Sequence, residues 1–305
     1  MKITRRGFVQ AGIGATAAGL LPAGWVHAAI EMGAMRIDSV SDGNLTLPAE
    51  FIFAPVPQDV AATVRAAHGL EGDMLTPPCN LTLLRHEGRT VLFDAGSGPN
   101  FQPSAGTLLD GLDALGVAPG DVTHVVFTHG HPDHLWGVLD DFDEPLFFDA
   151  EHLIGRAEFD YWADPATVDT IGAERQSFAV GAARRLAALA ERFSFFEDGD
   201  EVLPGVQAVA SYGHTPGHMA FELRAGGEAV LVTGDAIGND HIAFDRPDVP
   251  AGADQDMETA VATRAALFDR IMAEDMAILG FHLGQGGIGR VDRQGAGYVF
   301  LPDAG

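Results

Sequence analysis

The stretch Val125–Val138 reads VVFTHGHPDHLWGV and holds four potential metal ligands within six residues. It opens with an apolar run that has no helical period, which predicts a short buried strand. His129 and His131 are two residues apart, so both project from the same side of an extended chain. A proline then fixes φ and bends the chain before Asp133 and His134. Imidazole and carboxylate groups bind zinc, manganese or iron, and this order lets the two pairs face two neighbouring ions.

The composition indicates a globular protein with a strongly acidic surface. The chain has 305 residues, 47% of them hydrophobic, which is enough to bury a sizeable core. Aspartate and glutamate outnumber lysine and arginine by 43 to 18, giving a net charge of -25. Such a surface repels phosphate backbones and anionic lipid, so we expect no nucleic acid partner and a neutral small-molecule substrate. A single cysteine, Cys79, rules out an intramolecular disulfide and a cysteine-based zinc cluster.

Residues 1–28 have the pattern of an export signal. A basic start is followed by a moderately apolar stretch rich in alanine and glycine, and then by a small-residue cleavage site after Ala28 or Ala29. Thr4–Val9 reads TRRGFV and resembles the twin-arginine type, which carries folded proteins. Polar, glycine and proline residues interrupt the apolar stretch, so we expect no stable membrane span after processing. The sequence therefore predicts a periplasmic or secreted protein with one mature domain, residues 29–305.

Hydrophobic periodicity predicts a β-rich chain with several helices. Strands are predicted at Met35–Val40, Leu81–Leu84, Thr90–Phe93, Leu146–Phe148, Val206–Ser211, Ala220–Arg224, Ala229–Thr233 and Met276–Gly280, with an edge strand within Ile288–Leu301. Helices are predicted at Gln58–His68, Ser104–Leu115, Val180–Phe193 and Asp256–Ala273. Leu47–Pro57 holds two phenylalanines among three prolines and is expected to be an extended arm or loop. These phenylalanines suit packing, a substrate rim or the contact of a homodimer.

Three more segments place histidine or aspartate at the end of a predicted strand. Gly213–His218 reads GHTPGH and follows one strand, Asp235 ends the next hairpin, and His282 follows the last central strand. Loops at strand ends, held by a rigid scaffold, are where function concentrates. A polar loop that happens to be rich in histidine is the alternative interpretation, but four such segments in one chain favour a metal site.

Together with His-Gly-His-Pro-Asp-His at 129–134, these segments resemble the metallo-β-lactamase fold superfamily. The resemblance implies an α/β (α+β) fold, a four-layer αβ/βα sandwich of two mixed β-sheets with helices outside. It implies a ligand set in which Asp235 bridges two ions, the first bound by His129, His131 and His214 and the second by Asp133, His134 and His282. His218 is expected to orient a ligand or to line the site. Asp94 opens an Asp-Ala-Gly turn, and the resemblance implies that it lies near the ions but not on them, with ordinary turn chemistry as the equal alternative.

A site of this kind implies a hydrolase with two divalent metal ions. Two such ions share a bridging water and lower its pKa, so that a bridging hydroxide attacks carbon or phosphorus. Asp133 is then both a ligand and the candidate catalytic residue, because it accepts a hydrogen bond from the hydroxide or passes on a proton. Zinc is the first expectation for the metal, and manganese, iron or cobalt suit the same ligands.

Local detail within residues 78–300 is similar to methyl parathion hydrolase and its exported relatives. The similar stretches are His134–Val138, Gly234–Asp245 and Ala262–Val291. This resemblance implies a small neutral ester as substrate, whether a phosphotriester, an aryl ester or a lactone. Trp136, Phe159 and Trp162 are candidates for the substrate pocket, with core packing as the alternative. Leu283–Gly287 replaces an aromatic, proline-bearing segment of those relatives, so one wall of the pocket is expected to differ.

Two other functions stay open at the level of sequence. Acyl-homoserine lactonases, which act in quorum quenching, often carry a tyrosine shortly after the bridging aspartate. Here Ala236, Ile237 and Gly238 stand at those positions, and none of them supplies a hydroxyl group. A non-catalytic metal-binding protein is the other alternative, and the complete ligand set argues against it.

Overall fold

Two seven-stranded β-sheets form the centre of this computed structural model, which describes residues 26–303. Residues 1–25, most of the predicted export signal, lie outside the described residues. The first sheet has the order β1-β2-β5-β6-β7-β8-β9. Its strands are β1 (Val26–Met32), β2 (Met35–Asn44), β5 (Pro78–His86), β6 (Arg89–Phe93), β7 (His124–Phe127), β8 (Glu151–Gly155) and β9 (Phe193–Phe196). Neighbours are antiparallel from β1 to β6 and parallel from β6 to β9.

The second sheet runs in chain order from β10 to β16. Its strands are β10 (Glu201–Leu203), β11 (Val206–Ala210), β12 (Met219–Ala225), β13 (Glu228–Gly234), β14 (Ala277–Gly280), β15 (Ile288–Gln294) and β16 (Gly297–Pro302). All neighbours are antiparallel except β13 and β14, which run parallel. A two-stranded sheet of β3 (Leu47–Pro48) and β4 (Met74–Leu75) stands apart from both.

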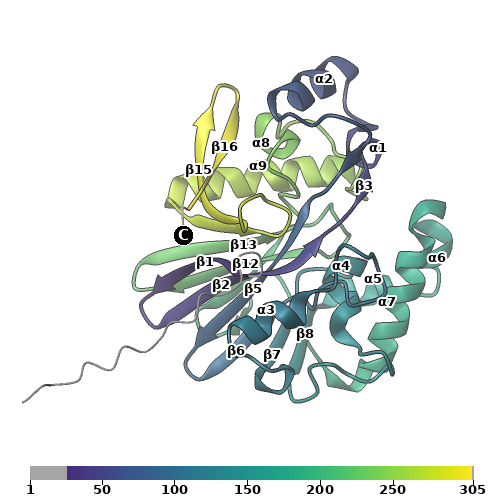
Figure 1. Ribbon diagram of the computed structural model, residues 1–305, viewed down its shortest axis with the longest axis vertical. Coiled ribbons are helices and arrows are strands. Elements are labelled where there is room, and N and C mark those ends of the chain that lie inside the picture. Colours follow the sequence, from purple (N-terminus) through teal and green to yellow (C-terminus); the bar gives the residue numbers. More distant parts are fainter. Residues whose placement is uncertain (1–25, 304–305) are drawn as a thin grey trace, which may run out of the picture.

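Central strands of both sheets bury side chains on both faces. In β13, Val230 faces the core between the sheets and Leu231 faces the helices outside. In β7, Val126 faces the core between the sheets and Phe127 faces the helical side. Since successive side chains of a strand point to opposite faces, two-sided burial requires continuous apolar runs. The four layers are visible in Figure 1, and the predicted sandwich of two mixed sheets with helices outside is confirmed.

The longer helices cover the outer faces of the sandwich (Figure 1). Helices α3 (Leu108–Ala114), α5 (Arg156–Ala163) and α7 (Gln176–Ala188) lie on the side of the first sheet, and α9 (Met257–Glu274) lies on the second. In α9, Leu267, Phe268 and Ile271 share one face and pack against the second sheet. This helix begins at a capping residue, Asp256, whose side chain accepts a hydrogen bond from the N–H of Thr259.

A smaller apolar cluster lies apart from the cores of the sandwich. It joins α1 (Ala49–Phe53) and α2 (Gln58–Ala67) to α8 (Ile242–Asp245) and the loop that follows α8. We call it the cap cluster, and its buried members are Ala49, Ile52, Phe53, Val56, Val64, Leu75, Ile242 and Val249. None of these residues belongs to the three larger clusters that fill the layers of the sandwich.

The predicted extended arm at Leu47–Pro57 is wrong. After the short strand β3 the chain turns into helix α1, in which Ile52 and Phe53 are buried. Pro48 stands at the N-cap, where a missing N–H breaks no helical hydrogen bond. The prolines of this region therefore bound a helix instead of preventing one.

Two further predictions need correction. The helix predicted at Ser104–Leu115 begins only at Leu108, because Gly106 has φ +87°, which a right-handed helix does not allow. The carboxylate of Asp42 then accepts a hydrogen bond from the N–H of Leu108 at 2.8 Å. The strand predicted at Leu146–Phe148 does not form, and Phe148 is 56% exposed. The short apolar run there belongs to the turn that precedes β8. Every other predicted strand and helix overlaps an observed element.

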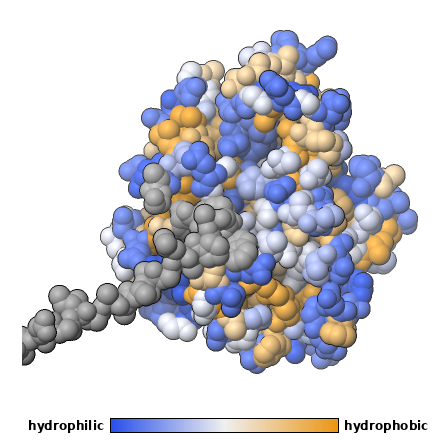
Figure 2. All heavy atoms as spheres, viewed as in Figure 1, coloured by the Kyte–Doolittle hydropathy of each residue, from blue (hydrophilic) through white to orange (hydrophobic). Residues whose placement is uncertain are grey.

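Hydrophilic residues predominate on the face shown in Figure 2, with hydrophobic residues interspersed among them. This agrees with the net charge of -25. Within residues 26–303, no helix combines the length and the apolar character needed to cross a membrane.

Candidate metal centre

The HGHPDH segment leaves β7 and turns directly into a single helical turn, α4 (Pro132–Leu135). His131 is still extended, with φ -66° and ψ 159°, whereas Asp133 and His134 lie on the turn. Pro132 occupies the first helical position, where its fixed φ suits the helix and its missing N–H is not needed. The first ligand pair of the segment therefore lies on extended backbone, and the second lies on a helical turn.

Seven side chains from the ends of β7, β11, β13 and β14 form two clusters of potential ligand atoms. Within each cluster the atoms lie within 4.8 Å of one another, and every residue is buried. The first cluster consists of His129, His131, His214 and Asp235, and the second consists of Asp133, His134, Asp235 and His282. These are the residues that the family resemblance assigns to the two ions.

Asp235 connects the two clusters through one carboxylate oxygen, Oδ2. Oδ2 lies 3.3 Å from His214 Nε2 in the first cluster and 3.3 Å from His282 Nε2 in the second. Oδ1 lies 3.4 Å from His134 Nε2. The backbone N–H of Asp235 donates to His218 Nε2 at 3.0 Å, and His218 Nδ1 contacts a serine hydroxyl, so His218 fixes the backbone that carries this carboxylate.

Hydrogen bonds on the outer side fix the rings of three ligand histidines. His134 donates from Nδ1 to Asp94 at 2.8 Å, and His282 donates from Nδ1 to a backbone carbonyl at 2.7 Å. His214 Nδ1 lies 3.1 Å from Asp254. A proton on Nδ1 leaves Nε2 as a bare acceptor that faces the cluster, which is the form of imidazole that binds metal.

His131 is oriented the other way round. Its Nδ1 points into the first cluster, 3.0 Å from His129 Nε2 and 2.9 Å from His214 Nε2. Its Nε2 lies 3.3 Å from the side-chain amide nitrogen of Gln255. Three imidazole nitrogens therefore converge on one point, as a single cation requires.

Buried atoms without hydrogen bonds indicate a cation in the second cluster. Asp133 Oδ2, His134 Nε2 and Asp235 Oδ1 are buried and have no hydrogen-bond partner within the described part of the chain. An unsatisfied buried polar group costs about 1–3 kcal/mol, so three together are unfavourable without a further partner. A divalent cation between them satisfies all three, and mixed imidazole and carboxylate ligands suit zinc, manganese, iron or cobalt.

Electrostatics of the clusters also favour bound positive charge. Burial by itself would raise the pKa of Asp235, but the imidazoles of His282 and His134 hold this pKa well below its ordinary value. Burial would lower the pKa of His214, but Asp235 and Asp254 raise it to about 9. The carboxylates are thus ionised in a buried place and need cations beside them. Imidazolium protons supply this charge in the metal-free chain, and divalent ions can take their place.

Glu158 is the main supporting residue that sequence reasoning missed. Its Oε1 accepts the N–H of Gly130, which lies between two ligands of the first cluster, at 2.8 Å. Its Oε2 accepts the hydroxyl of Thr215 at 2.8 Å and the N–H of Gly217 at 3.0 Å, in the loop that carries His214. Glu158 thereby ties together the two loops of the first cluster. No local pattern marks it, because its partners are distant in sequence.

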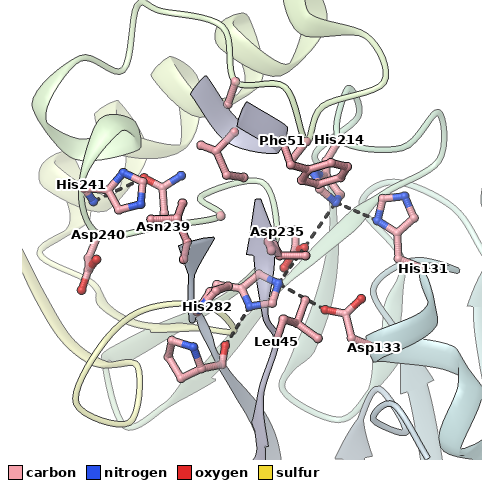
Figure 3. A pocket seen from close by; sticks show the side chains of 18 of the residues that line it. Leu45, Phe51, His131, Asp133, His214, Asp235, Asn239, Asp240, His241 and His282 are labelled. Carbon is pink, nitrogen blue, oxygen red and sulfur yellow. Dashed lines mark hydrogen bonds and ion pairs between the residues drawn. The ribbon is translucent and has the colours of Figure 1, made fainter. Parts of the chain in front are cut away.

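A cavity of about 220 Å³ opens beside the two clusters (Figure 3). Ligand side chains at its base are His131, Asp133, His214, Asp235 and His282. Its walls are mainly apolar and come from Leu45, Leu47, Phe51, Ile52, Leu70, Leu75, Phe101 and Phe178. Residues 238–241 make one polar side. This lining fits a neutral molecule with a substantial apolar part.

The three aromatic residues predicted for the substrate pocket do not line this cavity. Trp162 is fully buried, and its indole N–H donates to a glutamate carboxylate at 2.6 Å. Phe159 packs against the phenylalanines of β9. Trp136 lies outside the lining and packs edge-on against an aromatic wall residue. The aromatic walls are provided instead by Phe51, Phe101 and Phe178.

The Leu283–Gly287 segment forms a tight loop that keeps large side chains out of the cavity. Leu283 is buried, and its carbonyl oxygen accepts a hydrogen bond from the side chain of Asn80 at 2.8 Å. Gly287 has φ +74°, and a Cβ there would lie 2.2 Å from the carbonyl oxygen of Gly280. Only glycine fits this conformation and this close approach. At the cavity the loop contributes just the backbone of Gly284.

A family model described as Metallo-beta-lactamase superfamily matches residues 76–270. Metallo-beta-lactamase domain-containing protein 1 of Xenopus laevis is 32% identical over 174 residues, which cover 57% of this chain and 56% of that protein. N-acyl homoserine lactonase AttM of Azorhizobium caulinodans is 32% identical over 114 residues, or 37% of this chain and 40% of that protein. The chain thus spans about half the length of the curated relatives it matches.

Solved structures match over nearly the whole chain. The hydrolase AbOPH, described as in the beta lactamase superfamily, has a TM-score of 0.83 and 25% identity, covering 92% of this chain and 99% of its own. AidC, described as a dizinc quorum-quenching lactonase, has a TM-score of 0.85 and 21% identity, covering 92% of this chain and 97% of its own. At this identity the second likeness concerns the fold.

Proposed function

This chain belongs to the metallo-β-lactamase superfamily, and we propose that it is a hydrolase that uses two divalent metal ions to cleave small neutral esters. The observation that carries the proposal is the pair of buried ligand clusters that share Asp235 at the base of an apolar cavity. Zinc is the proposed metal, with manganese, iron and cobalt as alternatives for the same ligands.

The chemistry follows from the ligands and their surroundings. Divalent ions held here would lower the pKa of water and polarise the electrophilic oxygen of an ester. Asp133 lines the cavity, and its Oδ2 lies 3.2 Å from His282 Nε2, so it is placed to accept a proton beside the reacting atoms. The outer hydrogen bonds of the ligand histidines fix the direction of their rings and hold a proton on Nδ1, so Nε2 is the nitrogen that would give up its proton to a bound ion.

The cavity lining favours neutral substrates. Arg264 is the arginine among the lining residues, and its guanidinium donates to the carbonyl of Val249 at 2.9 Å and lies 3.5 Å from Asp254. Its charge is therefore already compensated, and Asp240 adds negative charge to the same cavity. An aryl phosphotriester, an aryl carboxyl ester and a lactone all meet these requirements.

A substrate panel on the mature chain, residues 29–305, tests this proposal. The protein is reconstituted with zinc, manganese or cobalt and offered an aryl phosphotriester, an aryl carboxyl ester and an acyl-homoserine lactone. We expect turnover of at least one ester in proportion to bound metal, up to two ions per chain, and loss of turnover in Asp235→Asn. Two bound ions without turnover of any of the three would favour a non-catalytic metal-binding protein instead.

We also propose that residues 1–28 direct export by the twin-arginine route to the periplasm or beyond. The support is the TRRGFV segment and the small-residue cleavage site. Expression with Arg5 and Arg6 replaced by lysine should leave the precursor in the cytoplasm. Sequencing of the exported protein should place its first residue at 29 or 30.

A further inference from the structure

Arg175 connects two parts of the cavity wall that come from separate parts of the fold. It is the N-cap residue of α7, the helix whose Phe178 lines the cavity. Its Nη2 donates to the carbonyl of Gly252 at 2.7 Å and to that of Ala253 at 3.2 Å, in the loop after α8. In Figure 1 α7 lies with the helices of the first sheet, whereas α1 and α8 lie in the upper part of the view. Arg175 therefore reaches from the sandwich to the cap.

The guanidinium of Arg175 stands where a cation is costly. The residue is only 9% exposed. Its ion-pair partner among the described residues is the carboxylate of Glu174, which is 3.7 Å away and 63% exposed, and such pairs contribute little. The two backbone carbonyls and the ring of Phe51, whose centroid lies 5.5 Å from the guanidinium carbon, are its main partners. Since an apolar side chain would avoid the desolvation cost, the contribution of Arg175 is a directed link.

The loop that Arg175 binds is itself fixed to α1. The N–H of Gly252 donates to the carbonyl of Ile52 at 2.9 Å. A Cβ at residue 252 would lie 2.3 Å from the carbonyl oxygen of Phe51, so only glycine permits this close approach. A bond from Arg175 to the loop therefore also holds Phe51 and Ile52, which both line the cavity.

Apolar packing alone does not fasten this wall to the sandwich. Ile52 and the other buried members of the cap cluster belong to none of the three larger apolar clusters. Parts of a protein with few buried contacts to the remainder open at a lower free energy than central strands. A charge-assisted link between the loop and α7 therefore bears directly on how closely the cap approaches α7.

We propose that Arg175 holds the cap against α7 and thereby limits the size of the molecule that the cavity accepts. With this link in place the cavity has about 220 Å³. The inference rests on the proposed ester hydrolysis and specifies its substrates as compact ones, because the link keeps the walls at Phe51 and Phe178 close together. Without the link, α1 and its loop move away from α7 and the cavity admits bulkier molecules.

Hydrogen exchange tests the link in the metal-loaded enzyme without any substrate. In Arg175→Met the backbone amides of residues 49–53 and 251–254 should exchange about tenfold or more faster than in the unaltered protein. The reason is that the loss of hydrogen bonds to a charged group lowers the free energy of local opening. Unchanged exchange in both segments overturns the proposal.

Arg185→Met is the matched control. Arg185 also lies in α7, is half-buried, and donates to two backbone carbonyls, those of Trp136 at 3.0 Å and Gly181 at 3.1 Å. Neither carbonyl belongs to the cap, so this variant should leave exchange in the cap segments unchanged. Equal acceleration in the two variants would show a general loosening of α7 and would overturn the specific role of Arg175.

Binding of a bulky neutral probe measures the size limit directly. N-Phenylnaphthylamine becomes fluorescent in apolar sites and contains no ester. Arg175→Met should bind it about fivefold or more tightly than the unaltered protein and Arg185→Met do. Arg175→Lys keeps the charge but lacks the planar fork, so it should change in the same direction by less, and it carries the test if the methionine variant does not fold. Equal affinity in all four proteins overturns the proposal.

Kinetics separate this inference from the proposed function. p-Nitrophenyl acetate and p-nitrophenyl diphenylacetate share a leaving group and differ in bulk. In Arg175→Met the ratio of kcat/KM, bulky over small, should rise about tenfold, whereas general destabilisation would lower both values alike. Hydrolysis of both esters with an unchanged ratio would overturn the size limit and leave the hydrolase. Faster exchange and tighter probe binding without hydrolysis of any ester or lactone would overturn the hydrolase and leave the size limit.

Discussion

The two ligand clusters share Asp235, but different parts of the molecule hold them in place. In the second cluster, His134 donates to Asp94, which follows β6 directly. His282 donates to the carbonyl of Pro78, the first residue of β5. Both partners belong to the first sheet or its immediate end. The second cluster is therefore supported by strands.

The first cluster is supported by loops and a helix. His214 and His131 contact Asp254 and Gln255, which lie in the loop before α9. Glu158 in α5 holds the backbone of both ligand-bearing loops. Loops generally open more easily than central strands, and sites on rigid elements are positioned more accurately. We therefore expect the first cluster to release its ion more readily than the second.

The largest effect is expected where the two clusters meet. Asp235→Asn removes a charged ligand from both, so the variant should bind less than one ion per chain and lose activity by about 10³-fold or more. Metal per chain by elemental analysis and kcat/KM on the best ester check this. A variant that keeps two ions and loses only activity would show that Asp235 is not a shared ligand.

Glu158→Gln should act on the first cluster alone. The amide keeps the shape of the side chain but turns an N–H₂ group toward donors that now need an acceptor. Each unsatisfied buried group costs about 1–3 kcal/mol, so the weaker ion should bind roughly a hundredfold less tightly. Chelator competition measures the two affinities. In a His214→Ala background, where the first cluster is already broken, Glu158→Gln should change nothing further.

Asp94→Asn is the matched change for the second cluster. The partner of His134 loses its charge but can still accept from Nδ1, so the affinity of the tighter ion should fall by about tenfold. The same chelator titration checks it, with His282→Ala as the background in which no further loss is expected. If Asp94→Asn and Glu158→Gln weakened the same ion, the two clusters would not have separate supports.

Acid should destabilise the first sheet, which supports the second cluster, through a residue remote from both clusters. His152 in β8 is buried, and neither ring nitrogen has a hydrogen-bond partner within residues 26–303. Burial and the charge of Arg192 lower its pKa from 6.5 to about 4. The unfolded chain binds this proton first as pH falls below 6.5, so stability is full above that pH and declines toward pH 4.

The contribution of His152 to the pH dependence of stability can be measured by comparing two proteins. Between about pH 7 and about pH 5.5 the unaltered protein should lose about 1 kcal/mol more unfolding free energy than His152→Leu, which cannot take up the proton. Urea unfolding of the two proteins at both pH values gives the comparison. Parallel declines of the two proteins would show that another group causes the acid sensitivity.

Sequence patterns predicted the features that depend on neighbouring residues and missed the features that depend on contacts between distant segments. The residues of the two clusters could be predicted because each lies in a recognisable segment after an apolar strand, as His129 and His282 do. The arrangement of the strands in two mixed sheets came from family resemblance, and the order of strands within each sheet was not predicted, since no periodicity encodes it. Glu158 and Asp254 were missed because they meet the ligand loops only in the folded chain.

The aromatic residues predicted for the pocket illustrate the same limit of sequence patterns. Phe159 and Trp162 stand in one aromatic stretch, and hydrophobicity alone does not say which way each ring turns. In the fold Trp162 turns inward because its N–H finds Glu158, whereas the cavity takes Phe51 from a segment expected to be extended. Rotation about a helix axis is decided by packing, which single-chain patterns do not contain.

The separation of the cap cluster from the sandwich affects how substitutions can change this protein in evolution. Its residues shape the cavity wall at Ile52 and Leu75, yet they share no apolar core with the sandwich that carries the ligands. Packing changes more than about 7–10 Å apart with no shared partners usually act independently. Substitutions in this cap can therefore alter the accepted substrate one mutation at a time, while the proposed metal chemistry is inherited unchanged.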